Sequence, residues 1–208
     1  ANEWTDIYQA ALLLRDHLAA DPDVQELYRP RLQAALVKLI TRGALPATER
    51  AEMGRLLAEL GDPRPHIGVD TNGLPDIDWV PIPAGEFRYG HESESDNPPQ
   101  TLVIPEFQIS RYPITYAQFQ AFLDAPDGFN RDEWWAEMPE QEEVLGTAYR
   151  VRELYEQRFK FANHPRENVS WYQAVAFCRW LSAKVGYEVT LPTEQQWEKA
   201  ARGTDGRL

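Results

Sequence analysis

The sequence predicts an α+β protein that begins with a small all-helical segment. Apolar residues repeat at helical spacing over residues 1–63, and a stretch rich in proline, glycine and short polar residues follows at 64–75. Beyond it, over residues 76–208, short β-type segments are joined by helices with recognisable N-terminal caps. These observations indicate a helical N-terminal segment, a linker and one mixed domain.

Three short amphipathic helices are expected in the first segment. Thr5 suits the N-cap of the first, Pro30 the start of the second, and the third follows Thr48. Gly43 and Gly61 suit the ends of the second and third. The apolar stripes consist of Ile7, Ala11, Leu14, Leu18, Leu32, Ala35, Leu36, Leu39, Ile40, Met53, Leu56, Leu57 and Leu60. Isolated helices of this length are marginal in water, so these stripes must pack on one another or on a neighbour.

The β-type segments lie early in the mixed domain. Residues 79–82 and 87–89 flank a turn-like stretch at 83–86, which predicts a β-hairpin. Alternating apolar residues over 103–109 predict one half-buried strand, with Pro105 near an edge. The irregular segment 126–168 is expected to be an insertion that contains a helix near 147–160.

Three helix starts have the capping-box pattern, a hydroxyl residue followed three positions later by glutamine. The pairs are Thr115 with Gln118, Ser170 with Gln173, and Thr193 with Gln196. In this motif the hydroxyl accepts a backbone N–H while the glutamine side chain accepts the N–H of the cap residue. Trp171, Trp180 and Trp197 in these helices are expected to lie in the core.

Charge and composition exclude several classes of partner. The net charge is −12, which repels phosphate backbones and anionic membranes, so neither nucleic acid nor a membrane is expected. No stretch approaches the ~20 apolar residues of a membrane span. The first apolar run is too short for a signal peptide, and there is one cysteine, Cys178. These features predict a cytoplasmic, prokaryotic protein.

Four sequence blocks occur in an order that resembles the formylglycine-generating-enzyme, or sulfatase-modifying-factor, family, a branch of the C-type lectin fold. The blocks are 79–87, 107–115, 168–181 and 191–203, the last being LPTEQQWEKAARG. The resemblance implies a C-type lectin-like domain over 76–208 that is incomplete at its C-terminus. In that family the remaining strands, the calcium-binding loops and the copper-holding cysteine pair of aerobic catalytic members follow the last block. We therefore assign no catalytic, cofactor or metal residue, although the family resemblance implies calcium.

Two functions follow from the resemblance. The first is a non-catalytic module that binds a protein or carbohydrate ligand, as in the variable proteins of diversity-generating retroelements or related bacterial sensing proteins. The second is the scaffold half of a formylglycine-generating oxidase that modifies a sulfatase cysteine, completed by a second chain or a C-terminal continuation. Because the cysteine pair is absent from these residues, we expect the binding module.

The remaining candidate residues favour structural roles. Cys178 lies on the inward face of a predicted helix, which indicates a buried, unreactive thiol. The adjacent pair Trp134 and Trp135 either clamps the insertion to the core or contacts a partner. The histidines His17, His66, His91 and His164 show no metal-ligand spacing. The oxygen-rich stretches 76–78 and 92–96 lack the spacing and turn glycine of a dedicated calcium loop.

Overall fold

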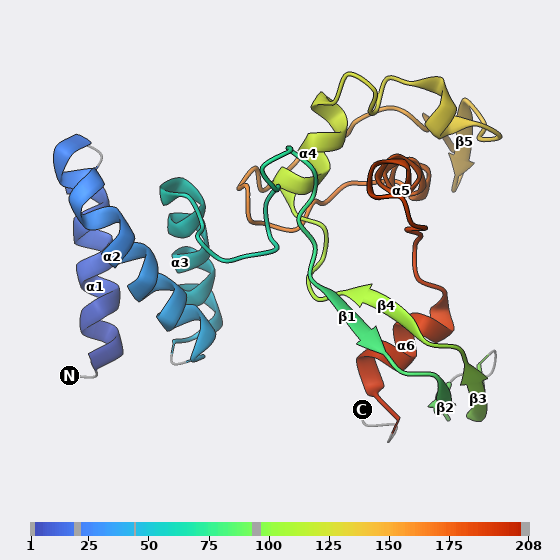
Figure 1. The fold of residues 1–208 in the computed structure, drawn as a ribbon, viewed down its shortest axis with the longest axis horizontal. Coiled ribbons are helices and arrows are strands. Elements are labelled where there is room, and N and C mark those ends of the chain that lie inside the picture. Colours follow the sequence, from blue (N-terminus) through green and yellow to red (C-terminus); the bar gives the residue numbers. More distant parts are fainter. Residues whose placement is uncertain (1–2, 19–21, 44, 93–96, 205–208) are drawn as a thin grey trace. The chain divides into compact units, whose positions relative to one another are not determined.

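The computed structural model describes residues 3–18, 22–43, 45–92 and 97–204, and the side chains of 3–4, 14–18 and 22–25 lie outside the description. The chain divides into two compact units (Figure 1). The first consists of residues 1–76, 114–121 and 156–168, and the second of residues 77–113, 122–155 and 169–208. The mixture of helices and short antiparallel strands confirms the α+β class.

Three helices form the core of the first unit. They are α1 (Glu3–Leu18), α2 (Pro22–Thr41) and α3 (Ala47–Leu60), coloured blue to teal in Figure 1. They pack on one another, with Tyr8, Ala11, Leu32, Leu36, Leu39, Leu45, Met53, Leu56, Leu57 and Leu60 buried together. The predicted stripes of the second and third helices are therefore confirmed, while Leu14 and Leu18 of the first lie among the undescribed side chains.

The helix boundaries differ from those predicted. Helix α2 begins at Pro22, and Pro30 lies inside it, so Pro30 does not start a helix. Proline removes one backbone N–H from a helix, and burial of Leu32, Leu36 and Leu39 on the same helix offsets that loss. Thr5 lies within α1 and is not its cap.

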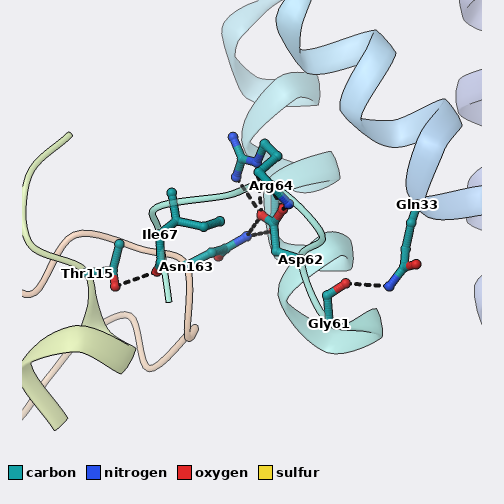
Figure 2. Close-up of polar contacts among 8 residues, drawn as sticks. Gln33, Gly61, Asp62, Arg64, Ile67, Thr115 and Asn163 are labelled. Carbon is teal, nitrogen blue, oxygen red and sulfur yellow. Dashed lines mark hydrogen bonds and ion pairs between the residues drawn. The ribbon is translucent and has the colours of Figure 1, made fainter. Parts of the chain in front are cut away.

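Polar contacts join the end of α3 to later parts of the same unit (Figure 2). Asp62 accepts hydrogen bonds from Arg64 at 2.6 Å and from Asn163 Nδ2 at 2.7 Å. Asn163 Nδ2 also donates to the Gly54 carbonyl at 2.9 Å. Burial by itself would raise the pKa of Asp62, but the hydrogen bonds from Arg64 and Asn163 hold that pKa below its ordinary value. Residues 156–168 are thereby tied to the helical segment.

The capping box of α4 (Tyr116–Asp124) also anchors the stretch between α3 and the first strand. The Thr115 N–H donates to Gln118 Oε1 at 3.0 Å, and the Gln118 N–H donates to Thr115 Oγ1 at 3.3 Å. Thr115 Oγ1 further donates to the Ile67 carbonyl at 2.8 Å, as Figure 2 shows, and Gln118 Nε2 donates to the Asp76 carbonyl. One buried pair therefore caps a helix and fixes a connecting segment.

An interrupted antiparallel ribbon opens the second unit. Strand β1 (Trp79–Ile82) pairs with β4 (Phe107–Ser110), and β2 (Gly85–Tyr89) pairs with β3 (Gln100–Ile104). The predicted hairpin between β1 and β2 is therefore wrong, and so is the single strand over 103–109. Both pairings keep one register, and the interruption falls at Pro83 and Pro105, which have no N–H for the ladder.

The insertion contains a short 3₁₀-helix and a β-hairpin. The 3₁₀-helix η1 spans Asp132–Trp135, and β5 (Gln141–Val144) pairs with β6 (Thr147–Arg150). The helix predicted near 147–160 is absent from this described stretch. Leu145 and Gly146 join the strands with φ of 51° and 80°, the conformation of a tight hairpin turn, which directs the chain back as a strand.

Helices α5 (Trp171–Val185) and α6 (Glu194–Arg202) complete the second unit, and both begin with the predicted capping boxes. Phe122, Phe129, Trp135, Phe177 and Trp180 form an aromatic cluster with centroid separations of 5.1–6.0 Å. Edge-to-face and tilted contacts at these distances are favourable beyond area burial. No helix among the described residues is long and apolar enough to cross a membrane.

The capping glutamines supply a stability test of the second unit. Gln173 is buried and its Nε2 also donates to the Glu153 carbonyl at 2.7 Å, whereas Gln196 on α6 is partly exposed. We expect Gln173→Ala to lower the free energy of unfolding by about 2–3 kcal/mol, because it removes the cap, the remote hydrogen bond and buried atoms. Gln196→Ala removes a cap alone and should cost about 1 kcal/mol or less. Chemical denaturation of both variants measures the difference, and equal losses would show that the Glu153 contact contributes nothing.

Candidate functional site

The last of the four sequence blocks forms a clamp between α6 and the ribbon. Lys199 is only 2% exposed, and its ammonium donates to the Pro83 carbonyl at 2.8 Å and the Gly85 carbonyl at 3.0 Å. The same ammonium lies 5.8 Å from the centre of the Phe87 ring. A buried charge requires hydrogen-bond partners, and these two carbonyls provide them. Lys199 therefore fixes the ribbon where β1 passes into β2.

Two further residues of α6 hold the other end of β2. The Gly90 N–H donates to Glu198 Oε1 at 2.8 Å, and Arg202 Nη1 donates to the Gly90 carbonyl at 2.9 Å. Arg202 and Glu198 form an ion pair at 2.6 Å, four positions apart on the helix. Gly90 has a φ of 84°, and a Cβ there would meet the Asn97 carbonyl oxygen at 2.6 Å, so only glycine fits.

The side chains that α6 packs against the ribbon are therefore polar, whereas its tryptophan is exposed. Trp197 is 62% exposed and Ala201 is also exposed, so the expected core position of Trp197 is wrong. Trp171 at the start of α5 is likewise 63% exposed, whereas Trp180 is buried as predicted. The most specific block of the sequence thus performs a scaffolding role.

The tryptophan pair of the insertion packs inward. Trp135 is 3% exposed and its indole N–H donates to the Phe129 carbonyl at 2.8 Å. Trp134 is partly buried and its indole N–H donates to the Asp127 carbonyl at 2.7 Å. Trp135 is thus part of the buried core, while Trp134 keeps part of its side chain exposed.

Cys178 lies inside α5 and is buried. Burial raises the pKa of its thiol to about 11. A thiol that is only 8% exposed and has a raised pKa is a poor nucleophile and a poor metal ligand.

The remaining polar candidates form local pairs. His66 Nδ1 lies 2.9 Å from Asp76 Oδ1, and Asp78 accepts a hydrogen bond from Arg111 at 2.5 Å. The His164 ring stacks on Phe159 at 4.8 Å. Among the described residues no group of three or more His, Cys, Asp or Glu side chains could hold a metal ion. The side chain of His17 and residues 93–96 lie outside the described part.

A polar hollow lies beside the β5–β6 hairpin in the second unit. We call it the arginine hollow; its volume is about 470 Å³ and it is lined by Asp132, Glu140, Gln141, Arg150 and Arg152. A neighbouring hollow of about 440 Å³ is lined by Arg150, Arg152 and Glu153. The two arginines therefore stand between two depressions large enough for a small ligand. Residue-by-residue reading of the sequence missed this site, because the helix expected near 147–160 would have dispersed these side chains.

Capped helices, an interrupted ribbon and a clamp from the last helix define this protein as an α+β scaffold domain with a helical segment attached. Residues 69–208 match the family described as "Sulfatase-modifying factor enzyme 1-like domain". The chain belongs to this family, which confirms the resemblance seen in the four sequence blocks.

Relatives of the chain are named as enzymes. A hercynine oxygenase of Mycolicibacterium smegmatis is 29% identical over 140 residues, which is 58% of this chain and 30% of the relative. A formylglycine-generating enzyme of Thermomonospora curvata is 29% identical over 162 residues, covering 60% and 48%. Another, of Streptomyces coelicolor, is 30% identical over 152 residues, covering 60% and 46%. The chain thus spans between 30% and 48% of the length of these curated relatives.

These names overturn the expectation of a non-catalytic binding module, because the relatives are enzymes. They also give no support to a kinship with variable proteins of diversity-generating retroelements. The error arose from treating the absence of a cysteine pair in these residues as evidence about the whole protein.

The residues present do not fit the copper that the family resemblance implies. Copper in that family is held by a cysteine pair, and this chain has the single buried Cys178. No step of a reaction can be derived through copper from these side chains.

The buried thiol predicts a specific pH dependence. The pKa of Cys178 is raised in the folded state, from an ordinary value of 9.0 to about 11, so folding favours the neutral thiol. Its contribution to stability is complete below pH 9 and is lost as pH rises through 11. The difference in unfolding free energy between the wild type and Cys178→Ala should therefore shrink over this interval, as followed by denaturation at each pH. In the same interval thiol reagents should begin to modify the native protein; rapid modification at pH 7 would contradict a buried thiol.

Proposed function

We propose that this chain provides the scaffold part of an oxidative enzyme of the sulfatase-modifying-factor family, one that converts a sulfatase cysteine to formylglycine. The observation that carries this proposal is the family match over residues 69–208 together with relatives named as formylglycine-generating enzymes. Those relatives share longer alignments with the chain, 162 and 152 residues, than the 140 residues shared with the hercynine oxygenase of Mycolicibacterium smegmatis.

The proposed contribution of these residues is to position the loops that form the catalytic site. The reacting groups come from elsewhere in the enzyme. Lys199, Glu198 and Arg202 hold the ribbon to α6 at both ends of β2. Gln173 holds the insertion to α5 through the Glu153 carbonyl. Such contacts fix where the loops of a domain leave the scaffold, which is what a catalytic site requires of its support.

We further propose a C-type lectin-like domain that is completed by a second chain or a C-terminal continuation. The second unit exposes an unusual set of large apolar side chains: Val103 at 70%, Trp171 at 63%, Trp197 at 62%, Tyr187 at 51% and Tyr112 at 46%. If these side chains form one patch, their exposure supports a surface that another segment covers. Calcium, implied by the family resemblance, would take its ligands from that segment, since the described residues supply no metal-binding group.

The single buried cysteine supports a cytoplasmic, prokaryotic setting for this enzyme. A reducing compartment keeps such a thiol free, and nothing in the second unit depends on a disulfide for its fold.

The proposal predicts oxidation of a sulfatase peptide by the full-length protein that contains this chain. The protein, loaded with copper, is incubated in air with a peptide spanning the sulfatase cysteine, and the aldehyde product is captured with a hydrazide and identified by mass spectrometry. Aldehyde should form in air and should not form without oxygen or with a peptide in which serine replaces the cysteine.

A parallel incubation supplies hercynine, a thiol and ferrous iron. Consumption of hercynine with no aldehyde on the peptide would replace formylglycine generation by the activity that the other relatives are named for. Failure of a folded, metal-loaded protein on both substrates would overturn the assignment to an oxidative enzyme.

A further inference from the structure

The end of β6 presents two arginines on one side of the insertion. Val151, the residue after β6, is 2% exposed, and its N–H donates to the Glu140 carbonyl at 3.2 Å, which extends the hairpin pairing by one position. Arg150 and Arg152 flank the buried Val151 in a turn that the Glu153 N–H closes by donating to the Arg150 carbonyl at 2.9 Å. Both arginines line the arginine hollow.

Arg152 is held before any ligand arrives. Its Nη1 donates to Asp132 Oδ1 at 2.7 Å, and its guanidinium carbon lies 4.9 Å from the centre of the buried Trp135 ring. An ion pair on one side and an aromatic face on the other fix a long side chain that would otherwise lose conformational entropy on binding. The other N–H groups of this guanidinium can still donate to a ligand.

Arg150 and Glu140 carry opposite charges that form no ion pair within the described residues. Within the described ranges neither side chain forms a hydrogen bond or an ion pair with another residue, although both line the same hollow. Gln141 lies directly across the hairpin from Arg150 and adds an uncharged amide to the lining. The hollow thus combines guanidinium donors with a carboxylate acceptor.

We infer that the arginine hollow binds a small zwitterion of the amino-acid type, a molecule with a carboxylate close to an ammonium group. The ligand carboxylate would receive N–H donors from Arg150 and Arg152, since a guanidinium matches a carboxylate in shape and charge. The ligand ammonium would donate to Glu140. A volume of about 470 Å³ is more than large enough to admit such a molecule.

The surrounding charges distinguish a zwitterion from simpler ions. A plain anion would meet Asp132, Glu140 and Glu153 around the two hollows, in a protein of net charge −12. A plain cation would meet two arginines. A ligand with both signs pairs with the two arginines and with Glu140, and this inference stands independently of the oxidative function proposed above.

Binding can be followed through Trp135, whose ring lies under Arg152 and whose indole N–H gives a separate signal in ¹H–¹⁵N NMR spectra. L-Alanine is titrated into the protein, with acetate and ethylammonium as the two half-ligands at equal concentration and constant ionic strength. Alanine should shift the Trp135 indole signal saturably, and neither half-ligand should do so at the same concentrations.

Substitutions of Arg150 and Glu140 then test which group of the ligand each side chain binds. Arg150→Gln should weaken alanine binding about tenfold or more, because one charge-assisted contact is lost. Glu140→Gln should weaken alanine while strengthening acetate, and Arg158→Gln, an exposed arginine outside the hollow, should change neither. Acetate binding as tightly as alanine to the wild type would overturn the zwitterion in favour of a simple anion site. Unchanged alanine affinity in both Arg150→Gln and Glu140→Gln, or no saturable shift at all, would overturn the site.

Discussion

The second unit depends on the burial of one ammonium group where the ribbon has lost its own hydrogen-bond donors. Pro83 and Pro105 face the interruption between the two strand pairs, and neither has an N–H for the ladder. Lys199 reaches this point from α6 and donates to the carbonyls of Pro83 and Gly85. This side chain thereby binds two main-chain carbonyls beside the interruption, and the same contact fixes the last helix to the first strands. Glu198 and Arg202 repeat the arrangement at Gly90, so α6 holds β2 at both ends.

Features set by neighbouring residues were predictable from the sequence. A hydroxyl and a glutamine three positions apart determine a helix start through hydrogen bonds that they make with each other's backbone, and all three predicted boxes are present. The buried stripes of α2 and α3 were equally clear, because apolar spacing decides which face of a helix packs.

Features set by distant residues were not predictable. Residues 79–82 and 85–89 look like a hairpin locally, yet the first pairs with residues 25–31 positions away and the second with residues 11–19 positions away. The register that the two pairs share shows that they form one ribbon. Leu145 adopts a positive φ that glycine or asparagine normally signals, so the turn of the insertion was hidden. Helix α6 packs polar side chains against the ribbon because main-chain carbonyls there accept their hydrogen bonds. The apolar spacing of this helix therefore predicted the wrong buried face. Among the site residues, Cys178 could be predicted from the sequence to be buried. The arginine hollow could not be predicted, because its side chains come together only through the β5–β6 hairpin.

The structural roles of these residues also explain how the chain can match the family without containing the family's cysteine pair. The last block that carries the family resemblance, which contains Lys199, stabilises the domain through contacts with the ribbon. Family membership therefore follows from this stretch directly, while the reaction has to be inferred from relatives of which the alignments cover 30–48%.

The most direct measurement of this account is the local opening free energy of β2, obtained from native-state hydrogen exchange in Lys199→Met, with Lys160→Met, which removes an exposed lysine, as the matched control. Exchange reports each unit separately, which global denaturation does not. If Lys199 is the donor on which the ribbon depends, its loss should lower the opening free energy of the β2 amides by about 2–3 kcal/mol, while Lys160→Met should change them by less than ~0.5 kcal/mol. Equal protection of β2 in the two variants, or greater protection in Lys199→Met, would contradict the central role given to this buried ammonium.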